Sequence, residues 1–200
     1  MRKNRISKRI PAAAASAVLA LGAVVGTGAV TAPAVADAPA QSEAAASYEV
    51  GFLQDMIDHH AMAVAMSQTC LQKATHQELK ELCQSILEAQ QQEIGQMQTW
   101  LHDWYGITYE PKMSEGDMRS MDRFETYTGA EYEIRFMQSM IRHHWAAVRE
   151  AEECLESAEH AELTELCSNI REVQLAEISQ MQTWLEQWYD RSGGRPAATT

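Results

Sequence analysis

The chain contains one sixty-residue segment twice, at residues 46–105 and 130–189. The two copies align at a constant offset of 84 without a gap and are identical at 33 of the 60 positions. The identical positions include polar residues and sulfur-containing residues as well as core-forming ones: Met56, His59, His60, Cys70, Cys83, Gln90, Glu93 and Met97 recur as Met140, His143, His144, Cys154, Cys167, Gln174, Glu177 and Met181. A repeat that only filled a core would not need this polar set. We therefore expect the duplication to carry a function or a polar network.

The first 36 residues read as a signal peptide. Five basic residues precede an Ala/Val/Leu/Gly run over residues 12–30, and Ala34-Val35-Ala36 forms a cleavage site before Asp37. We expect a secreted mature chain with a flexible segment at 37–46, a duplicated domain at 47–190 with its connector at 106–129, and a disordered tail at 191–200.

The formal charge of the whole chain is −12, and loss of the five basic leader residues would make it −17. This acidity argues against nucleic acid as a partner. No second apolar stretch is long enough to span a bilayer, so we expect no membrane span in the mature chain.

Four cysteines in an exported chain favour disulfides, and four cysteines allow three pairings. Each copy of the repeat has one early and one late cysteine, so the pairings Cys70–Cys83 and Cys154–Cys167 treat the copies alike. Pairing between the copies, or free buried thiols, are the alternatives.

Each copy has the pattern of a helical hairpin. Apolar residues in the first copy recur at steps of three and four before and after Ala74, which is typical of two amphipathic helices. Thr75 and Glu78 have the spacing of a capping box that begins the second helix, and Gly106 suits its end. Two hairpins predict an all-α four-helix bundle. The connector is expected to hold a short helix near 116–127, and the order of the four helices stays open.

A polar group lies at the middle of the predicted helices. His59 and His60 are at mid-length of one helix, Glu93 at mid-length of the next, and either bundle topology brings both copies to a similar level. Met56 precedes the two histidines by three and four residues, on the same helix face. Thioethers with imidazoles select copper, especially Cu(I), and by the same argument silver. The chain has no Glu-x-x-His, which disfavours a di-iron centre.

The residues Phe52-x3-Met56-Ile57-x-His59-His60 and Gln90-x2-Glu93-Ile94-x2-Met97, with their copies, resemble the exported ferritin-like proteins of domain of unknown function 305. The resemblance implies a ferritin-like bundle of two hairpins and covers nearly the whole mature chain. Some periplasmic members of that family bind copper and are linked to copper resistance. By position, the resemblance implicates as metal ligands Met56, His59, His60, Met66, Glu93, Met97, Met140, His143, His144, Glu177 and Met181.

One departure from the family pattern is that Glu150 stands in the second copy where the first has Met66, and Trp145 replaces Ala61 beside the second histidine pair. We therefore expect a Met/His-rich site in the first copy and a weaker one in the second, with Trp145 crowding it.

The leading hypothesis is an exported protein that binds and sequesters copper, as Cu(I) or Cu(II), without turnover. The first alternative is a secreted structural or interaction module whose His/Gln/Glu cluster is a hydrogen-bond network that fixes helix register. The second is a metal-dependent redox enzyme, which would need an open coordination position and a substrate path.

Overall fold

The protein was analysed as a computed structural model that describes residues 42–190 and 195–196. The predicted signal peptide, its cleavage site and most of the predicted tail lie outside these residues. The described chain forms four long helices and one short helix: α1 (Glu43–Lys73), α2 (Gln77–Tyr105), α3 (Glu115–Thr126), α4 (Gly129–Ser157) and α5 (Ala161–Trp188). Two short strands, β1 (Tyr189–Asp190) and β2 (Arg195–Pro196), pair antiparallel after α5.

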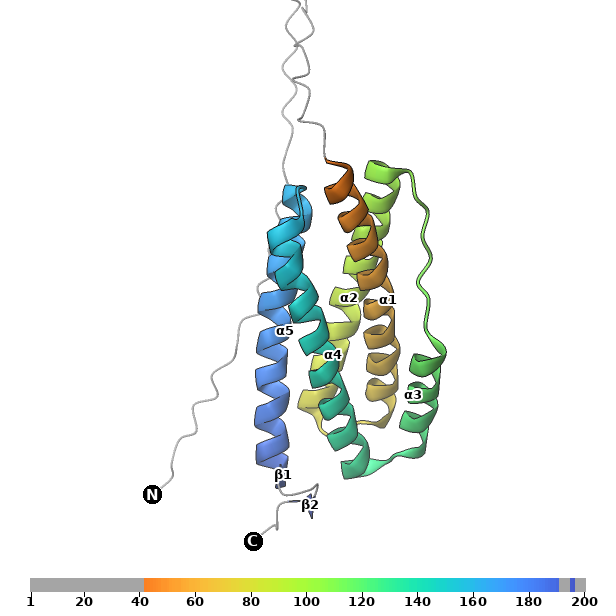
Figure 1. The fold of residues 1–200 in the computed structure, drawn as a ribbon. Coiled ribbons are helices and arrows are strands. Elements are labelled where there is room, and N and C mark those ends of the chain that lie inside the picture. Colours follow the sequence, from red (N-terminus) through yellow and green to blue (C-terminus); the bar gives the residue numbers. More distant parts are fainter. Residues whose placement is uncertain (1–41, 191–194, 197–200) are drawn as a thin grey trace, which may run out of the picture. The chain divides into compact units, whose positions relative to one another are not determined.

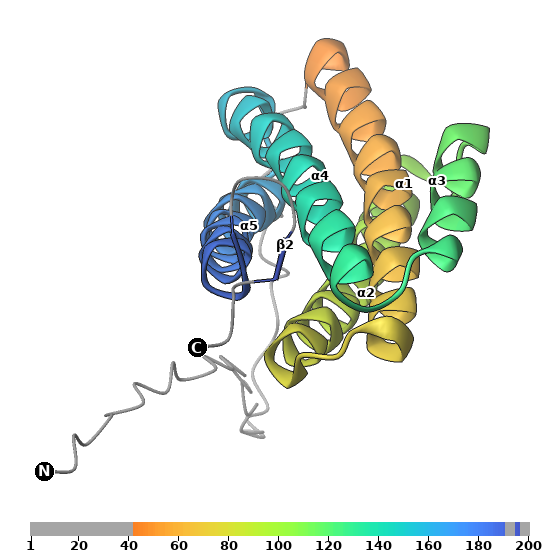
Figure 2. The same ribbon diagram turned by 90° about the horizontal axis from the view of Figure 1, so that it is seen from below.

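The four long helices form a bundle of two hairpins, which confirms the predicted fold class (Figure 1). Helix α1 packs along α2, and α4 packs along α5. The hairpins meet through α1 and α4, and α3 lies outside the bundle beside α1, as the end view of Figure 2 shows. Among the described helices, none combines the length and apolarity needed to cross a lipid bilayer.

Local signals in the sequence account for most helix ends. The Ser42 hydroxyl accepts the Ala45 amide hydrogen at the start of α1, so the last residues of the segment expected to be flexible are helical. Gly106 ends α2 at φ 67°, a left-handed conformation that glycine adopts without strain. Ser114 and Asp117 form a capping box at the start of α3.

The capping box predicted at Thr75 is wrong. Helix α2 begins after His76, which makes no side-chain cap hydrogen bond, and the Thr75 hydroxyl donates instead to the Glu133 carboxylate of the other hairpin at 2.9 Å. The tertiary partner displaces the local one because Glu133 is fully buried and needs every donor within reach.

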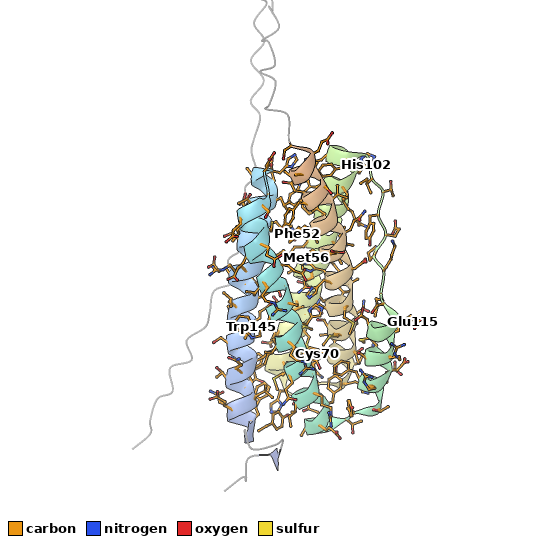
Figure 3. All side chains as sticks on the ribbon, viewed as in Figure 1. Phe52, Met56, Cys70, His102, Glu115 and Trp145 are labelled. Atoms are coloured by element: carbon orange, nitrogen blue, oxygen red, sulfur yellow. A yellow bond between two sulfur atoms is a disulfide. The ribbon has the colours of Figure 1, made fainter. Side chains whose placement is uncertain are left out.

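Both predicted disulfides are present, Cys70–Cys83 and Cys154–Cys167, each next to the tip of its hairpin. All four cysteines are fully buried. Figure 3 shows the side chains that fill the bundle, with Met56 and Cys70 at successive levels. Each disulfide ties the two helices of one hairpin together in the same way, as the repeat predicts.

A buried glutamate near the start of each hairpin joins it to the tip of the other. Glu133 accepts hydrogen bonds from the Thr75 and His76 amides, and its carboxylate also contacts the His76 ring at 2.6 Å. The Tyr189 hydroxyl donates to the same carboxylate, and the Trp188 indole stacks on the His76 ring with centroids 3.9 Å apart. We call this set of contacts the tip clamp.

The second tip clamp has the same arrangement at the offset of 84, with Glu159 at the position of Thr75. Glu49 accepts from the Glu159 and His160 amides, contacts the His160 ring at 2.6 Å, and accepts from the Tyr105 hydroxyl. Trp104 stacks on His160 with ring centroids 3.8 Å apart. The start of each hairpin thus lies at the tip of the other, so the hairpins are antiparallel and related by a pseudo-twofold axis.

Acid should unfold the protein through the two tip clamps. Burial alone would raise the pKa of Glu49 and of Glu133, but the hydrogen bonds donated to each carboxylate lower it from 4.5 to about 2. Because the folded-state pKa is lowered, the stabilisation is complete above about pH 4.5 and is lost as the pH falls towards 2. Each carboxylate contributes roughly 3 kcal/mol, and Glu49→Gln or Glu133→Gln should flatten the loss of unfolding free energy between pH 5 and 2.5 in urea titrations.

The matched control is Glu172→Gln, which changes an exposed glutamate on α5 and should leave the acid dependence as it is. If Glu49→Gln and Glu133→Gln showed the same acid dependence as the native chain, acid unfolding would not depend on these two carboxylates.

Candidate metal centre

Two histidine pairs meet at the middle of the bundle. His59 and His60 come from α1, and His143 and His144 from α4. Since α1 and α4 are antiparallel and in contact, the pseudo-twofold axis passes between the pairs, and the His59 and His143 rings lie with centroids 3.6 Å apart. The expectation that the two copies face one another at the same level is confirmed. We call these four residues the histidine belt.

Three of the four rings have one nitrogen bonded to an oxygen atom of another residue. His60 Nε2 lies 2.8 Å from a Glu93 oxygen, and His144 Nε2 lies 2.7 Å from a Glu177 oxygen. His143 Nε2 donates to the His59 carbonyl at 3.1 Å. A neutral ring that donates through Nε2 carries its lone pair on Nδ1. Metal-bound histidines commonly have this arrangement, with the second nitrogen donating to a carboxylate or a carbonyl.

The remaining ring nitrogens of the belt have no hydrogen-bond partner among the described residues. These are Nδ1 of His60, His143 and His144, and both nitrogens of His59, and all are buried. A buried polar atom without a partner costs about 1–3 kcal/mol, so native structures rarely leave one unsatisfied. These five buried imidazole nitrogens belong to four neighbouring rings, and imidazole nitrogen is a donor type that metal ions accept.

Burial keeps the two central rings neutral. It lowers the pKa of His59 to about 3, with a further contribution from His60 and His144. The pKa of His143 is also well below its usual value, again through burial first and then through His59. Neutral imidazole is the form that binds metals. Neither ring therefore has to lose a proton before it can bind a metal ion.

A cavity of about 310 Å³ leads from the surface to the two central rings. His59 and His143 line it, and so do Met62 and Met113. Its other lining residues come from α1, the connector and the first turn of α3: Asp58, Lys112, Ser114 and Asp117. The cavity therefore combines two imidazoles and two thioethers with two carboxylates.

Asp58 holds the connector over this cavity. Its carboxylate accepts the Tyr109 hydroxyl hydrogen at 2.8 Å and the Lys112 amide hydrogen at 2.6 Å. This places Met113, the next residue, at the cavity wall. Sequence reasoning missed Met62 and did not assign Met113 to the site, because the path of the connector depends on these tertiary hydrogen bonds.

The methionines implicated by the sequence lie elsewhere. Met56 and Met97 pack in one apolar core cluster, and Met66, Met140 and Met181 pack in the other. All five are at most 2% exposed, and none lines the cavity. Among the described residues, no three His, Cys, Asp or Glu side chains come together as a metal-binding group. An ion at the belt would therefore have few ligands of these types.

Trp145 and Glu150, which distinguish the second copy from the first, do not lie at the histidine belt. Trp145 is 41% exposed on the surface, so the expectation that it crowds the second histidine pair is wrong. Glu150 lies in a groove with Asp55 and Glu153, where burial and these two carboxylates raise its pKa. The first histidine of each copy lies at the same place, with the His59 and His143 ring centroids 3.6 Å apart.

The glutamines of the polar set are not fully paired. The side-chain oxygens of Gln90 and Gln174 are buried without a hydrogen-bond partner among the described residues. The expected hydrogen-bond network therefore contains the two His–Glu pairs but leaves these glutamine oxygens unsatisfied.

Several solved structures have this fold. CopM in its Cu(I)-bound form is 33% identical, with a TM-score of 0.64 over 70% of this chain and 97% of that chain. CopM in its Cu(II)-bound form gives the same values, and a silver-bound form has a TM-score of 0.63 at 33% identity over the same share of this chain and 96% of that chain.

Two structures from named organisms are also similar. A DUF305 fragment from Deinococcus radiodurans is 27% identical, with a TM-score of 0.62 over 70% of this chain and 96% of that chain. A candidate secreted DUF305 protein from Streptomyces coelicolor is 25% identical, with a TM-score of 0.62 over 70% of this chain and 93% of that chain.

Among proteins with curated descriptions, none matches this sequence. The profile of a domain of unknown function, DUF305, matches residues 49–185 and again 133–199, so that the second match begins at the equivalent of the first residue in the other copy. The match spans more than half of the chain and both histidine pairs, and the chain belongs to the DUF305 family.

Proposed function

We propose that this protein is exported and that it binds and sequesters copper at the histidine belt. The observation that carries the proposal is the set of buried, unpaired imidazole nitrogens beside a cavity lined by Met62 and Met113. His59 and His143 would bind the ion from the two copies, and the thioethers would receive it from solvent. Copper is the cargo in this proposal, and no turnover is needed.

The donor types favour a soft ion. Imidazole and thioether suit Cu(I), and silver shares this preference, whereas Mg²⁺ and Ca²⁺ prefer sites built mainly of oxygen ligands. Cu(I) also tolerates few ligands, which suits a centre where no three His, Cys, Asp or Glu side chains of the described chain converge. The copper-bound and silver-bound forms of CopM support this choice of metal.

The two disulfides and the similarity to a candidate secreted protein support export. Disulfides persist in oxidising compartments and are rare in the cytosol. The acidic surface would attract cations to the protein from outside the cavity.

A structural role of the belt is the second candidate, and the two His–Glu pairs favour it. His60 with Glu93, and His144 with Glu177, each join the two helices of one hairpin. In that case the pairs would fix helix register without any metal. The two roles can be separated because they concern different histidines.

Replacing both His59 and His143 by alanine should abolish the copper site and leave the bundle folded. The His60–Glu93 and His144–Glu177 pairs, both disulfides and both tip clamps remain in this variant. We expect Cu(I) affinity, measured by competition with a chromogenic chelator, to fall at least a hundredfold, with helical circular dichroism retained. Met62→Leu with Met113→Leu keeps the volume and should weaken Cu(I) binding about tenfold.

The matched control is His102→Ala, which removes an exposed histidine at the end of α2 and should not change Cu(I) affinity. Native-like Cu(I) binding by the folded His59/His143 variant would refute the proposed centre. Elemental analysis of native protein purified without chelator provides an independent measurement.

Glu93→Ala should lower the free energy of unfolding more than Glu93→Gln does. The fully buried His60 loses its hydrogen-bond partner in Glu93→Ala, which should cost about 1–3 kcal/mol of unfolding free energy in urea titrations. Glu93→Gln keeps an acceptor oxygen and should cost less. Glu88→Ala, an exposed change on the same helix, is the control. Equal stability of Glu93→Ala and the control would show that the pair has no structural role.

A further inference from the structure

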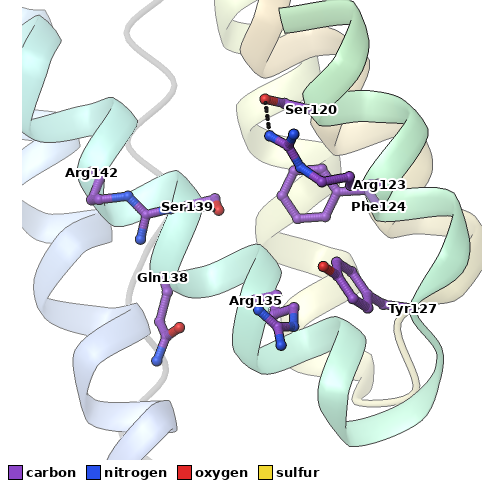
Figure 4. A pocket seen from close by; sticks show the side chains of 8 residues that line it. All are labelled: Ser120, Arg123, Phe124, Tyr127, Arg135, Gln138, Ser139 and Arg142. Atoms are coloured by element: carbon purple, nitrogen blue, oxygen red, sulfur yellow. Dashed lines mark hydrogen bonds between the residues drawn. The ribbon is translucent and has the colours of Figure 1, made fainter. Parts of the chain in front are cut away.

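A second pocket, of about 270 Å³, lies between α3 and α4 and contains three arginines. Figure 4 shows Arg123 of α3 on one side and Arg135 and Arg142 of α4 on the other. Its remaining lining consists of hydroxyl and amide groups and aromatic rings: Ser120, Ser139, Gln138, Phe124 and Tyr127. Among the described residues, no carboxylate lines this pocket, which we call the arginine pocket.

Two of the guanidinium groups are held in place by neutral partners. Arg123 Nη2 donates to the Ser120 hydroxyl, and Arg142 Nη2 donates to the Ser139 hydroxyl, each at 2.9 Å (Figure 4 for the first). Neither arginine has a carboxylate within ion-pair distance in the described part of the chain. Both positive charges are therefore oriented by their own helices and left without a counter-charge.

The third guanidinium is fixed by an aromatic ring. Arg135 lies over the Tyr127 ring at 4.5 Å from its centroid and donates through Nε to Glu131 at 3.0 Å. Both groups of this ion pair are more than half exposed, so the pair contributes little and leaves the other guanidinium hydrogens available. Stacking on Tyr127 limits the rotation of the side chain and keeps the group at the pocket.

This concentration of positive charge is unexpected in so acidic a chain. Residues 42–190 contain nine Lys and Arg residues against 27 Asp and Glu residues, and three of the nine line one small pocket. The repeat provides an internal comparison. The positions of the first copy that correspond to Arg135, Ser139 and Arg142 are Gly51, Asp55 and Asp58. The donors on α4 thus belong to the second copy alone, at positions where the shared fold does not need them, and Arg123 lies in the connector.

We infer that the arginine pocket binds a small, doubly charged oxyanion, and that phosphate is its representative ligand. Guanidinium groups match the geometry of phosphate oxygens through paired N–H donors, and the serine hydroxyls and the Gln138 amide can add further donors. The volume admits a phosphate group and is slightly below the range of typical pockets for drug-sized ligands. The negative charge of the whole chain disfavours polyanions and anionic membrane surfaces, so the ligand is a free solute.

The test is a phosphate titration of the full protein, followed by amide NMR shifts at constant ionic strength, with sodium chloride as the reference salt. We expect saturable shifts on α3 and α4 with a half-point of about 1 mM, as two or three charge-assisted hydrogen bonds would give. Arg123→Gln with Arg142→Gln should weaken binding at least tenfold. Titration with glycerol 3-phosphate identifies the source: tighter binding than inorganic phosphate would indicate an organic phosphate.

Arg119→Gln is the matched control, because it removes the same charge from α3 at a residue that pairs with Glu115 outside the pocket. The control should bind phosphate within twofold of the native protein. Shifts that match those in sodium chloride, or equal weakening in the control and in the double variant, would overturn the proposal.

Discussion

The buried carboxylates of Glu49 and Glu133 determine how the two hairpins of this protein are joined. Each is fully buried at the start of one hairpin, and each can be satisfied only by the amides, the histidine ring and the tyrosine hydroxyl at the tip and end of the other. A parallel arrangement would leave both charges buried without partners, which would cost several kcal/mol each. The antiparallel arrangement follows, and with it the level at which α1 passes α4. Because both clamps are built from equivalent residues, that level is the middle of the bundle, where His59 meets His143.

Sequence periodicity predicted the hairpins, the symmetry of the repeat predicted the disulfides, and a short connector helix was also expected. Each depends on residues close together in the chain. The docking of the hairpins was not predictable in the same way. Glu49 and Glu133 lie near helix starts, where acidic residues are usually solvated and favourable, and Thr75 had a plausible local partner in Glu78. The signal that could have revealed the clamp was the identity of Glu, His, Trp and Tyr in both copies at 49, 76, 104 and 105. Two aromatic residues together with a glutamate and a histidine are more typical of a buried contact between hairpins than of an exposed surface.

The sequence also could not show that the two histidines of each pair contact different hairpins. Adjacent residues point about 100° apart around a helix, so His60 turns towards Glu93 of its own hairpin while His59 turns towards the other hairpin. The implicated methionines had suitable spacing from the histidines, yet Met56, Met66 and Met97 do not line the cavity, whereas Met62, from the same core cluster as Met66, does. Thioethers fill apolar gaps as well as they bind metal, and spacing alone does not separate the two roles.

The duplication supplies a symmetric centre, and the connector makes its surroundings asymmetric. Met113 and α3 have no equivalent because the connector occurs once, and the residue equivalent to Met62 is Ala146. Helix α3 packs against Tyr132 through Phe124, whereas the equivalent Tyr48 lines an open groove with Asp55 and Glu153. The single connector therefore places Met113 beside a cavity that Met62 of α1 and the two central histidines also line. In the proposed copper site, the ion would approach from the side of this cavity. The imidazoles that would bind it come from two equivalent helices, α1 and α4.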